Sequence, residues 1–193
     1  EMCRRDRPIG VSHYLRMLKT AVEEMQSGTG EIEEEINVEI LLPFEALLPS
    51  FYIPDEQEKI SVYQKLAGSE DEAILAEFEE DLQEEYGKLP PAVENLFAVL
   101  RLKMECRRAG VVRVKVEDKT KDQREVIISL SPRVTAEEIM ELLKLNSQWK
   151  ISGSTLRLNE EEIARVAKND VTWMQELARQ VKALQPKKKG TKK

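Results

Sequence analysis

The feature that most limits how this chain can fold is a strictly alternating segment near its middle. Residues 111–118 read VVRVKVED, with valines at positions 112, 114 and 116 and charged side chains between them. Because successive side chains of a β-strand point to opposite faces, the segment predicts a strand with one buried face. A second strand is predicted at 124–131, REVIISLS, and the polar residues KTKDQ between the two predict a hairpin.

Three helices and a further strand are predicted before this hairpin. Residues 55–67, 70–86 and 91–110 carry apolar side chains at three- and four-residue spacings, the pattern of a helix buried along one side. Asp55 is the expected cap of the first of them, since its carboxylate can accept from the free N–H groups of the first turn. Residues 36–42, INVEILL, turn from alternating to wholly apolar and are expected to form a strand with one end deeply buried.

Another hairpin and two helices are predicted after it. Thr135 and Glu138 have the spacing of a capping box, which predicts a helix beginning there. Two short β-like pieces, QWKIS and STLRL, predict a second hairpin. Asn159 is expected to cap one long final helix that buries Val166 among its apolar side chains.

These elements predict an α+β fold, a single compact domain with a small, mainly antiparallel sheet packed by several helices. Glycine and proline residues set off an amphipathic segment at 10–27, so residues 1–30 are interpreted as a helical arm. The main domain is expected over residues 31–185. Residues 186–193, PKKKGTKK, are interpreted as a flexible lysine-rich tail.

The sequence lacks the usual elements of a catalytic, cofactor-binding or metal-binding site. It contains no glycine-rich phosphate loop, its only histidine is His13 on the arm, and Cys3 and Cys106 belong to no metal-binding pattern. We therefore expect a non-catalytic chain with no cofactor and no metal. A hydrolase that uses two carboxylates is the remaining enzymatic alternative, and it would require a buried pair in a cleft.

The charge of the chain favours protein partners. The net charge is −6, and the tail contributes five lysines and no acid, so the rest of the chain carries −11. A strongly acidic body repels phosphate backbones, which disfavours nucleic-acid binding by the folded part. No apolar stretch is long enough to cross a bilayer and the first residues do not resemble a signal peptide, so a cytoplasmic location is expected.

The most unusual segment is the acidic helix predicted at residues 70–86. Nine of the sixteen positions from Glu70 to Glu85 are Asp or Glu, and none is Lys or Arg. At ~100° per residue, Glu77, Asp81 and Glu84 share one flank of the apolar stripe and form what we call the acidic edge. Two interpretations remain open: a solvated face that keeps the protein soluble, or a docking edge for a basic surface.

Other segments have two interpretations as well. The lysine tail is either a solubilising end or a non-specific contact to nucleic acid, and the latter would make the chain a nucleic-acid-binding module together with the Arg113/Lys115 strand face. Trp149 and Trp173 are expected to pack in the interior. Phe51 and Tyr52 form either an exposed recognition loop or a lid over the core, and we favour the lid.

Two segments resemble a known protein family. FYIPDEQEKISVYQKLA at 51–67 and DLQEEYGKLPPAVENLFAVLRLKMECRRAGV at 81–111 are similar, in the same order, to the C-terminal domain of bacterial transcription-repair coupling factors (Mfd). Residues 9–25, IGVSHYLRMLKTAVEEM, resemble the stretch that links the translocase module of that family to this domain. The chain departs from the family at Gln83–Glu85, where an acid followed by arginine is common.

The resemblance implies a regulatory role. Family members displace RNA polymerase stalled at a DNA lesion by ATP-driven translocation on DNA, and recruit nucleotide excision repair through UvrA. ATP and magnesium belong to their motor domains, so DNA is bound through the parent protein and not through this domain. The resembled domain autoinhibits the parent by docking on its N-terminal UvrB-like module and masking UvrA recruitment, and Glu77, Asp81 and Glu84 are the expected intramolecular docking edge.

Overall fold

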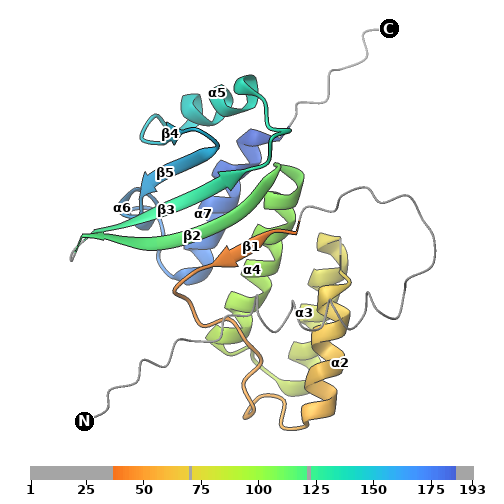
Figure 1. The fold of residues 1–193 in the computed structure, drawn as a ribbon. Coiled ribbons are helices and arrows are strands. Elements are labelled where there is room, and N and C mark those ends of the chain that lie inside the picture. Colours follow the sequence, from red (N-terminus) through yellow and green to blue (C-terminus); the bar gives the residue numbers. More distant parts are fainter. Residues whose placement is uncertain (1–36, 70, 121–122, 186–193) are drawn as a thin grey trace, which may run out of the picture. The chain divides into compact units, whose positions relative to one another are not determined.

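The computed structural model describes residues 37–69, 71–120 and 123–185. Their contacts divide the chain into two units, one formed by residues 44–97 and the other by residues 37–43 and 98–185. Figure 1 labels the elements of both units. The predicted arm at 1–30 and tail at 186–193 lie outside the described residues, so these boundaries stay predictions.

The first unit is helical. It contains α2 (Glu56–Ala67), α3 (Glu72–Tyr86) and the first part of α4 (Pro91–Arg108), preceded by an extended segment. The predicted cap of α2 is confirmed, because Asp55 accepts hydrogen bonds from the backbone N–H groups of Gln57 and Glu58 at 2.8 and 2.9 Å. The most buried side chains of the first unit come from the extended segment and from all three helices: Ile53, Leu66, Leu75, Val93, Leu96 and Phe97.

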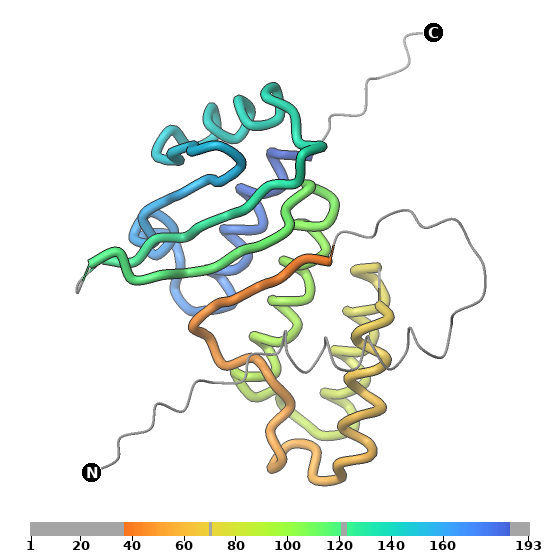
Figure 2. The backbone as a smooth tube through the Cα atoms, in the orientation of Figure 1, coloured from red at the N-terminus to blue at the C-terminus, as the bar shows by residue number. Residues whose placement is uncertain are grey.

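The second unit is built on a five-stranded sheet. Its strands are β1 (Glu39–Leu41), β2 (Val111–Thr120), β3 (Gln123–Leu130), β4 (Lys150–Ser152) and β5 (Thr155–Asn159). The strand order is β1-β2-β3-β5-β4, which the backbone trace of Figure 2 lets the reader follow. Of the strand pairs in the described residues, only β1–β2 is parallel, so the prediction of a mainly antiparallel sheet is confirmed.

One face of this sheet is apolar and covered by helices. Ile40, Val114, Ile128 and Leu156 are aligned across four strands and all are buried. The second part of α4 and α7 (Asp170–Val181) lie behind this sheet in Figure 1. The unit also contains α5 (Ala136–Leu145), α6 (Glu161–Ala164) and the short 3-10 helix η1 (Lys182–Leu184).

The predicted caps and tryptophans behave as expected in this unit. Thr135 and Glu138 form the reciprocal capping box of α5. Trp149 and Trp173 are 3% and 4% exposed, and the indole N–H of Trp149 donates to Gln180 Oε1 at 2.8 Å. Both tryptophans therefore pack in the interior.

The prediction of one continuous final helix is wrong. Asn159 Oδ1 does accept from the N–H of Glu161 at 3.2 Å, but the helix that begins there, α6, ends at Ala164. Asn169 then caps a new helix by exchanging hydrogen bonds with Thr172. Because Val166 lies between the two helices, it is 63% exposed and not buried as predicted. A strong cap inside the apolar pattern has split the helix.

Candidate functional site

Helix α3 carries the acidic edge and is built around few buried side chains. Asp71 caps its start by accepting from the N–H of Ala73 at 3.0 Å. Leu75 and Leu82 are buried, at 0% and 5% exposure, and anchor the helix to the first unit. Ile74, whose spacing from Phe78 and Leu82 predicts a place in the same apolar stripe, is instead 43% exposed. One narrow buried stripe leaves most of the helix surface in water.

The three residues of the acidic edge lie on that exposed surface. Glu77, Asp81 and Glu84 are all exposed, and their spacing along a regular helix places them on one flank. Among the residues that the structure describes, none forms an ion pair with any of the three. The last turn of α3 also lacks a basic residue, so Glu84 and Glu85 face the negative end of the helix dipole without compensation.

Each of the other described α-helices has one acid that is neutralised locally. Lysine or arginine side chains pair with glutamates three residues away on five helices: Lys59 with Glu56, Arg108 with Glu105, Lys144 with Glu141, Arg165 with Glu162, and Arg179 with Glu176. The sequence of α3 offers no lysine or arginine for such a pair. The negative charge of its acidic edge therefore remains available to a partner.

A proline-flanked loop packs against the C-terminal end of the same helix. The hydroxyl of Tyr52 lies 2.8 Å from the carbonyl oxygen of Leu82 and 3.0 Å from that of Gly87. Its ring centroid is 5.6 Å from that of Tyr86, with the planes tilted by 54°. A hydrogen bond to the carboxylate of Glu58 raises the pKa of Tyr86 well above its ordinary value, and burial adds to this effect.

The lid interpretation of this loop holds for one of its two aromatic residues. Tyr52 is 7% exposed and covers the core as predicted, whereas the side chain of Phe51 is 79% exposed. Neighbouring aromatic residues in an irregular segment carry no periodicity that would separate an inward side chain from an outward one. The exposure of Phe51 could therefore not be derived from the sequence.

The basic strand face of the alternative nucleic-acid-binding interpretation is already neutralised. Arg113 Nε lies 2.6 Å from a carboxylate oxygen of Glu39, and Lys115 Nζ lies 2.5 Å from one of Glu117. These cations would have to exchange their partners for phosphate. The tail that this alternative also uses lies outside the described residues.

Few groups of the described part could support chemistry. Glu160 is the one buried acidic residue in residues 37–69, 71–120 and 123–185, and it is paired with Arg124 at 2.6 Å. Burial also raises the pKa of the Cys106 thiol, with the charge of Glu105 adding to the shift. In the same ranges, no group of three or more His, Cys, Asp or Glu side chains is arranged to hold a metal ion.

Of the helices in the described ranges, none combines the length and the apolar character needed to cross a bilayer.

Comparisons with known proteins agree on one family. The sequence profile of the TRCF domain matches residues 42–139, just over half of the chain. The transcription-repair-coupling factor of Staphylococcus haemolyticus is 32% identical over 154 residues, which cover 80% of this chain and 13% of that protein. The corresponding protein of Bacillus subtilis is 26% identical over 190 residues, which cover 95% of this chain and 15% of its own length.

A solved structure shows the same fold. The crystal structure of the C-terminal domain of a transcription-repair coupling factor superposes with a TM-score of 0.63 at 22% identity, and the match covers 77% of this chain and 91% of that one. The family resemblance and the α+β fold expected from the sequence are both confirmed. The chain spans only a small part of the length of its curated relatives, and it belongs to the TRCF domain family.

Proposed function

We propose that this chain is a non-catalytic regulatory domain that autoinhibits a transcription-repair coupling factor. It docks through Glu77, Asp81 and Glu84 on the N-terminal UvrB-like module of the same protein and masks the surface that recruits UvrA. Engagement of the parent with lesion-stalled RNA polymerase releases the domain, and nucleotide excision repair is then recruited. ATP-driven translocation on DNA belongs to other parts of the parent, as do its ATP and magnesium.

The observation that carries this proposal is the unpaired acidic edge. Membership of the TRCF domain family supplies the context, and α3 supplies three exposed carboxylates that no described residue neutralises. Fixed charge of this kind steers a basic partner surface and sets its orientation more than it adds affinity. A regulatory contact within one protein must hold and also release, and a polar interface serves that requirement better than a large apolar one.

The test is a titration of this chain into the isolated UvrB-like module, followed by calorimetry at low and moderate salt. Reversal of the acidic edge to lysine should weaken binding at least tenfold and remove most of its salt dependence. Helix α3 should survive the change, because lysine is a good helix former and is favourable near a helix C-terminus.

A matched control changes the net charge by the same amount elsewhere. Asp118, Glu137 and Glu161 are exposed residues of the second unit, and reversing all three should leave binding near the wild-type value. Equal loss in both variants would mean that overall charge, and not the edge, governs the contact. In the full-length parent, reversal of the edge should increase UvrA binding, and unchanged UvrA binding would contradict the masking role.

A further inference from the structure

Phe51 is the most exposed large apolar side chain in the described part of the chain. Its exposed fraction is 79%, whereas its neighbours Tyr52 and Ile53 are 7% and 0% exposed. The fold thus turns the two following residues inward and directs a whole phenylalanine side chain into water. Folding gains almost nothing from its apolar surface, which leaves that surface available to a partner.

The backbone that presents Phe51 is held on both sides. The carbonyl oxygen of Pro49 accepts from the N–H groups of Tyr52 and Ile53 at 3.0 and 3.1 Å, which closes a tight turn around Phe51. Two hydrogen bonds of the Tyr52 hydroxyl then fasten the turn to the C-terminal end of α3. A side chain presented on a preformed turn loses little conformational entropy when it binds.

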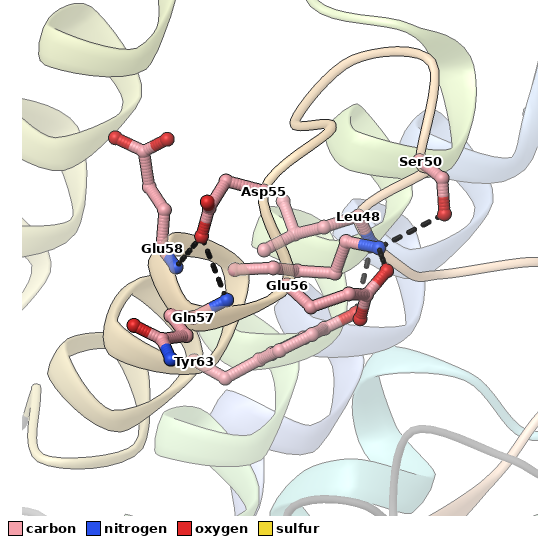
Figure 3. Close-up of polar contacts among 8 residues, drawn as sticks. Leu48, Ser50, Asp55, Glu56, Gln57, Glu58 and Tyr63 are labelled. Carbon is pink, nitrogen blue, oxygen red and sulfur yellow. Dashed lines mark hydrogen bonds and ion pairs between the residues drawn. The ribbon is translucent and has the colours of Figure 1, made fainter.

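A lysine fastens the other side of the same turn. Lys59 Nζ lies 3.0 Å from Ser50 Oγ and 2.8 Å from Glu56 Oε1, and its side chain is only 10% exposed. Figure 3 shows Ser50 and Glu56 with these contacts at the start of α2. Lys59 therefore neutralises Glu56 and is not available to the other exposed acids near Phe51.

The end of the first unit that carries Phe51 is strongly acidic. Residues 49–59 contribute three exposed acids, of which Glu56 is paired with Lys59. Residues 81–90, which the Tyr52 hydroxyl joins to the turn, contribute three more. Lys88 is the only exposed cation of these two segments. An apolar side chain surrounded by acidic residues is complementary to an apolar pocket bordered by Lys and Arg. It is not complementary to a phosphate backbone or to a second copy of this acidic chain.

We propose that Phe51 is the apolar anchor of the docking interface and inserts into an apolar pocket, rimmed by basic residues, on another module of the parent protein. The inference rests on the proposed function and deepens it. The acidic edge sets the orientation and the rate of docking, and Phe51 supplies affinity that salt does not screen. Aromatic side chains are enriched in the buried centres of protein interfaces for this reason.

The test compares Phe51→Ala with a matched control, Val166→Ala, which truncates another exposed apolar residue at 63% exposure. Each variant of this chain is titrated by calorimetry into the parent coupling factor, from which the corresponding domain has been deleted. Phe51→Ala should weaken binding about 10- to 30-fold and leave the salt dependence unchanged. Val166→Ala should bind with the affinity of the wild type. The urea unfolding midpoint of Phe51→Ala should equal that of the wild type, which shows that the variant is folded.

The outcomes separate this inference from the proposed function. If the wild type binds and Phe51→Ala binds equally well, the anchor is wrong while the acidic edge stands. If the wild type does not bind in trans, the test is a photo-crosslinking phenylalanine analogue placed in the full-length parent at the residue that corresponds to Phe51. A cross-link to a basic-rimmed pocket on any other module supports the anchor, and one outside the UvrB-like module refutes only the proposed partner. No cross-link beyond this domain, or cross-links only between two copies, overturns the anchor.

Discussion

Two buried tyrosines offer a direct measurement of what an unsatisfied backbone group costs in this domain. The Tyr63 hydroxyl accepts from the N–H of Leu48 at 2.8 Å, as Figure 3 shows, whereas the Tyr52 hydroxyl donates to carbonyl oxygens at the end of α3. Tyr63 and Tyr52 are 6% and 7% exposed and belong to the same unit. Replacement by phenylalanine keeps the ring in both cases, so the loss of stability in each variant reports the hydroxyl alone. Comparing the two losses then compares the two kinds of hydrogen bond.

The expected magnitudes differ because the groups left behind differ. Tyr63→Phe leaves the N–H of Leu48, a residue that is 3% exposed, without its acceptor, which should cost about 2 kcal/mol. Tyr52→Phe removes a donor from two carbonyls that keep other options. Leu82 O also lies within the hydrogen-bond ladder of α3, and Gly87 is exposed to water. Tyr52→Phe should therefore cost only about 1 kcal/mol.

Urea unfolding monitored by far-UV circular dichroism measures both values, since this signal reports the helices of the domain, those of the first unit included. In thermal unfolding of a chain of this size, the melting temperature should fall by about 4–8 °C for Tyr63→Phe and by about 2–4 °C for Tyr52→Phe. Equal losses of stability, or a larger loss for Tyr52→Phe, would refute the argument. That argument holds that a buried N–H left without an acceptor costs more than two carbonyl oxygens that lose a donor.

Three further predictions concern other parts of the domain. Gly110→Ala should destabilise more than Gly153→Ala in the same unfolding assay: both positions have positive φ, 72° and 58°, but only at Gly110 would the added Cβ meet another side chain, 2.6 Å away. Equal losses would contradict the steric argument. Cys106, in a variant whose other cysteine is serine, should resist Ellman's reagent at pH 8 in the native state and react at once in urea, because burial raises the pKa of its thiol. Rapid native reaction would show that the site opens. The hydrogen bond from Lys119 lowers the pKa of Glu125, so this carboxylate stabilises the fold above its unfolded pKa and loses that contribution as pH falls through its lower folded pKa. Glu125→Gln should therefore be less stable than the wild type at pH 7 and should approach it below about pH 4, and a gap that stays constant with pH would contradict the assignment.

Local patterns predicted the elements of this fold more readily than their partners. The caps at Asp55 and Thr135 and the alternation of residues 111–118 depend on neighbours in the sequence, and the structure contains all of them. The final helix was overextended because the cap at Asn169 interrupts an otherwise continuous apolar periodicity. The parallel pairing of β1 with β2 was also absent from the prediction, since it joins segments far apart in the chain.

In the candidate site, too, the features that depend on neighbouring residues could be predicted, and those that depend on distant residues could not. Exposure of Glu77, Asp81 and Glu84 followed from helical geometry alone, since each lies away from a narrow apolar stripe. The orientation of Phe51 depended on where the Tyr52 hydroxyl finds its partners, 30 and 35 residues further along the chain. Sequence reasoning therefore located the charges of the site and missed its exposed aromatic residue.

The position of the first unit between β1 and β2 has a consequence for the order in which the domain is completed. The described residues of the first unit all lie within 44–97, whereas Arg113 and Glu39 are 74 residues apart in the sequence. Joining β1 to the sheet closes a long loop, and the entropy cost of that loop decreases once the intervening chain is already folded. During synthesis the helical unit emerges before any of β2, so it can fold first and act as a preformed spacer. The parallel pairing of β1 with β2 is then made after the helical unit has formed.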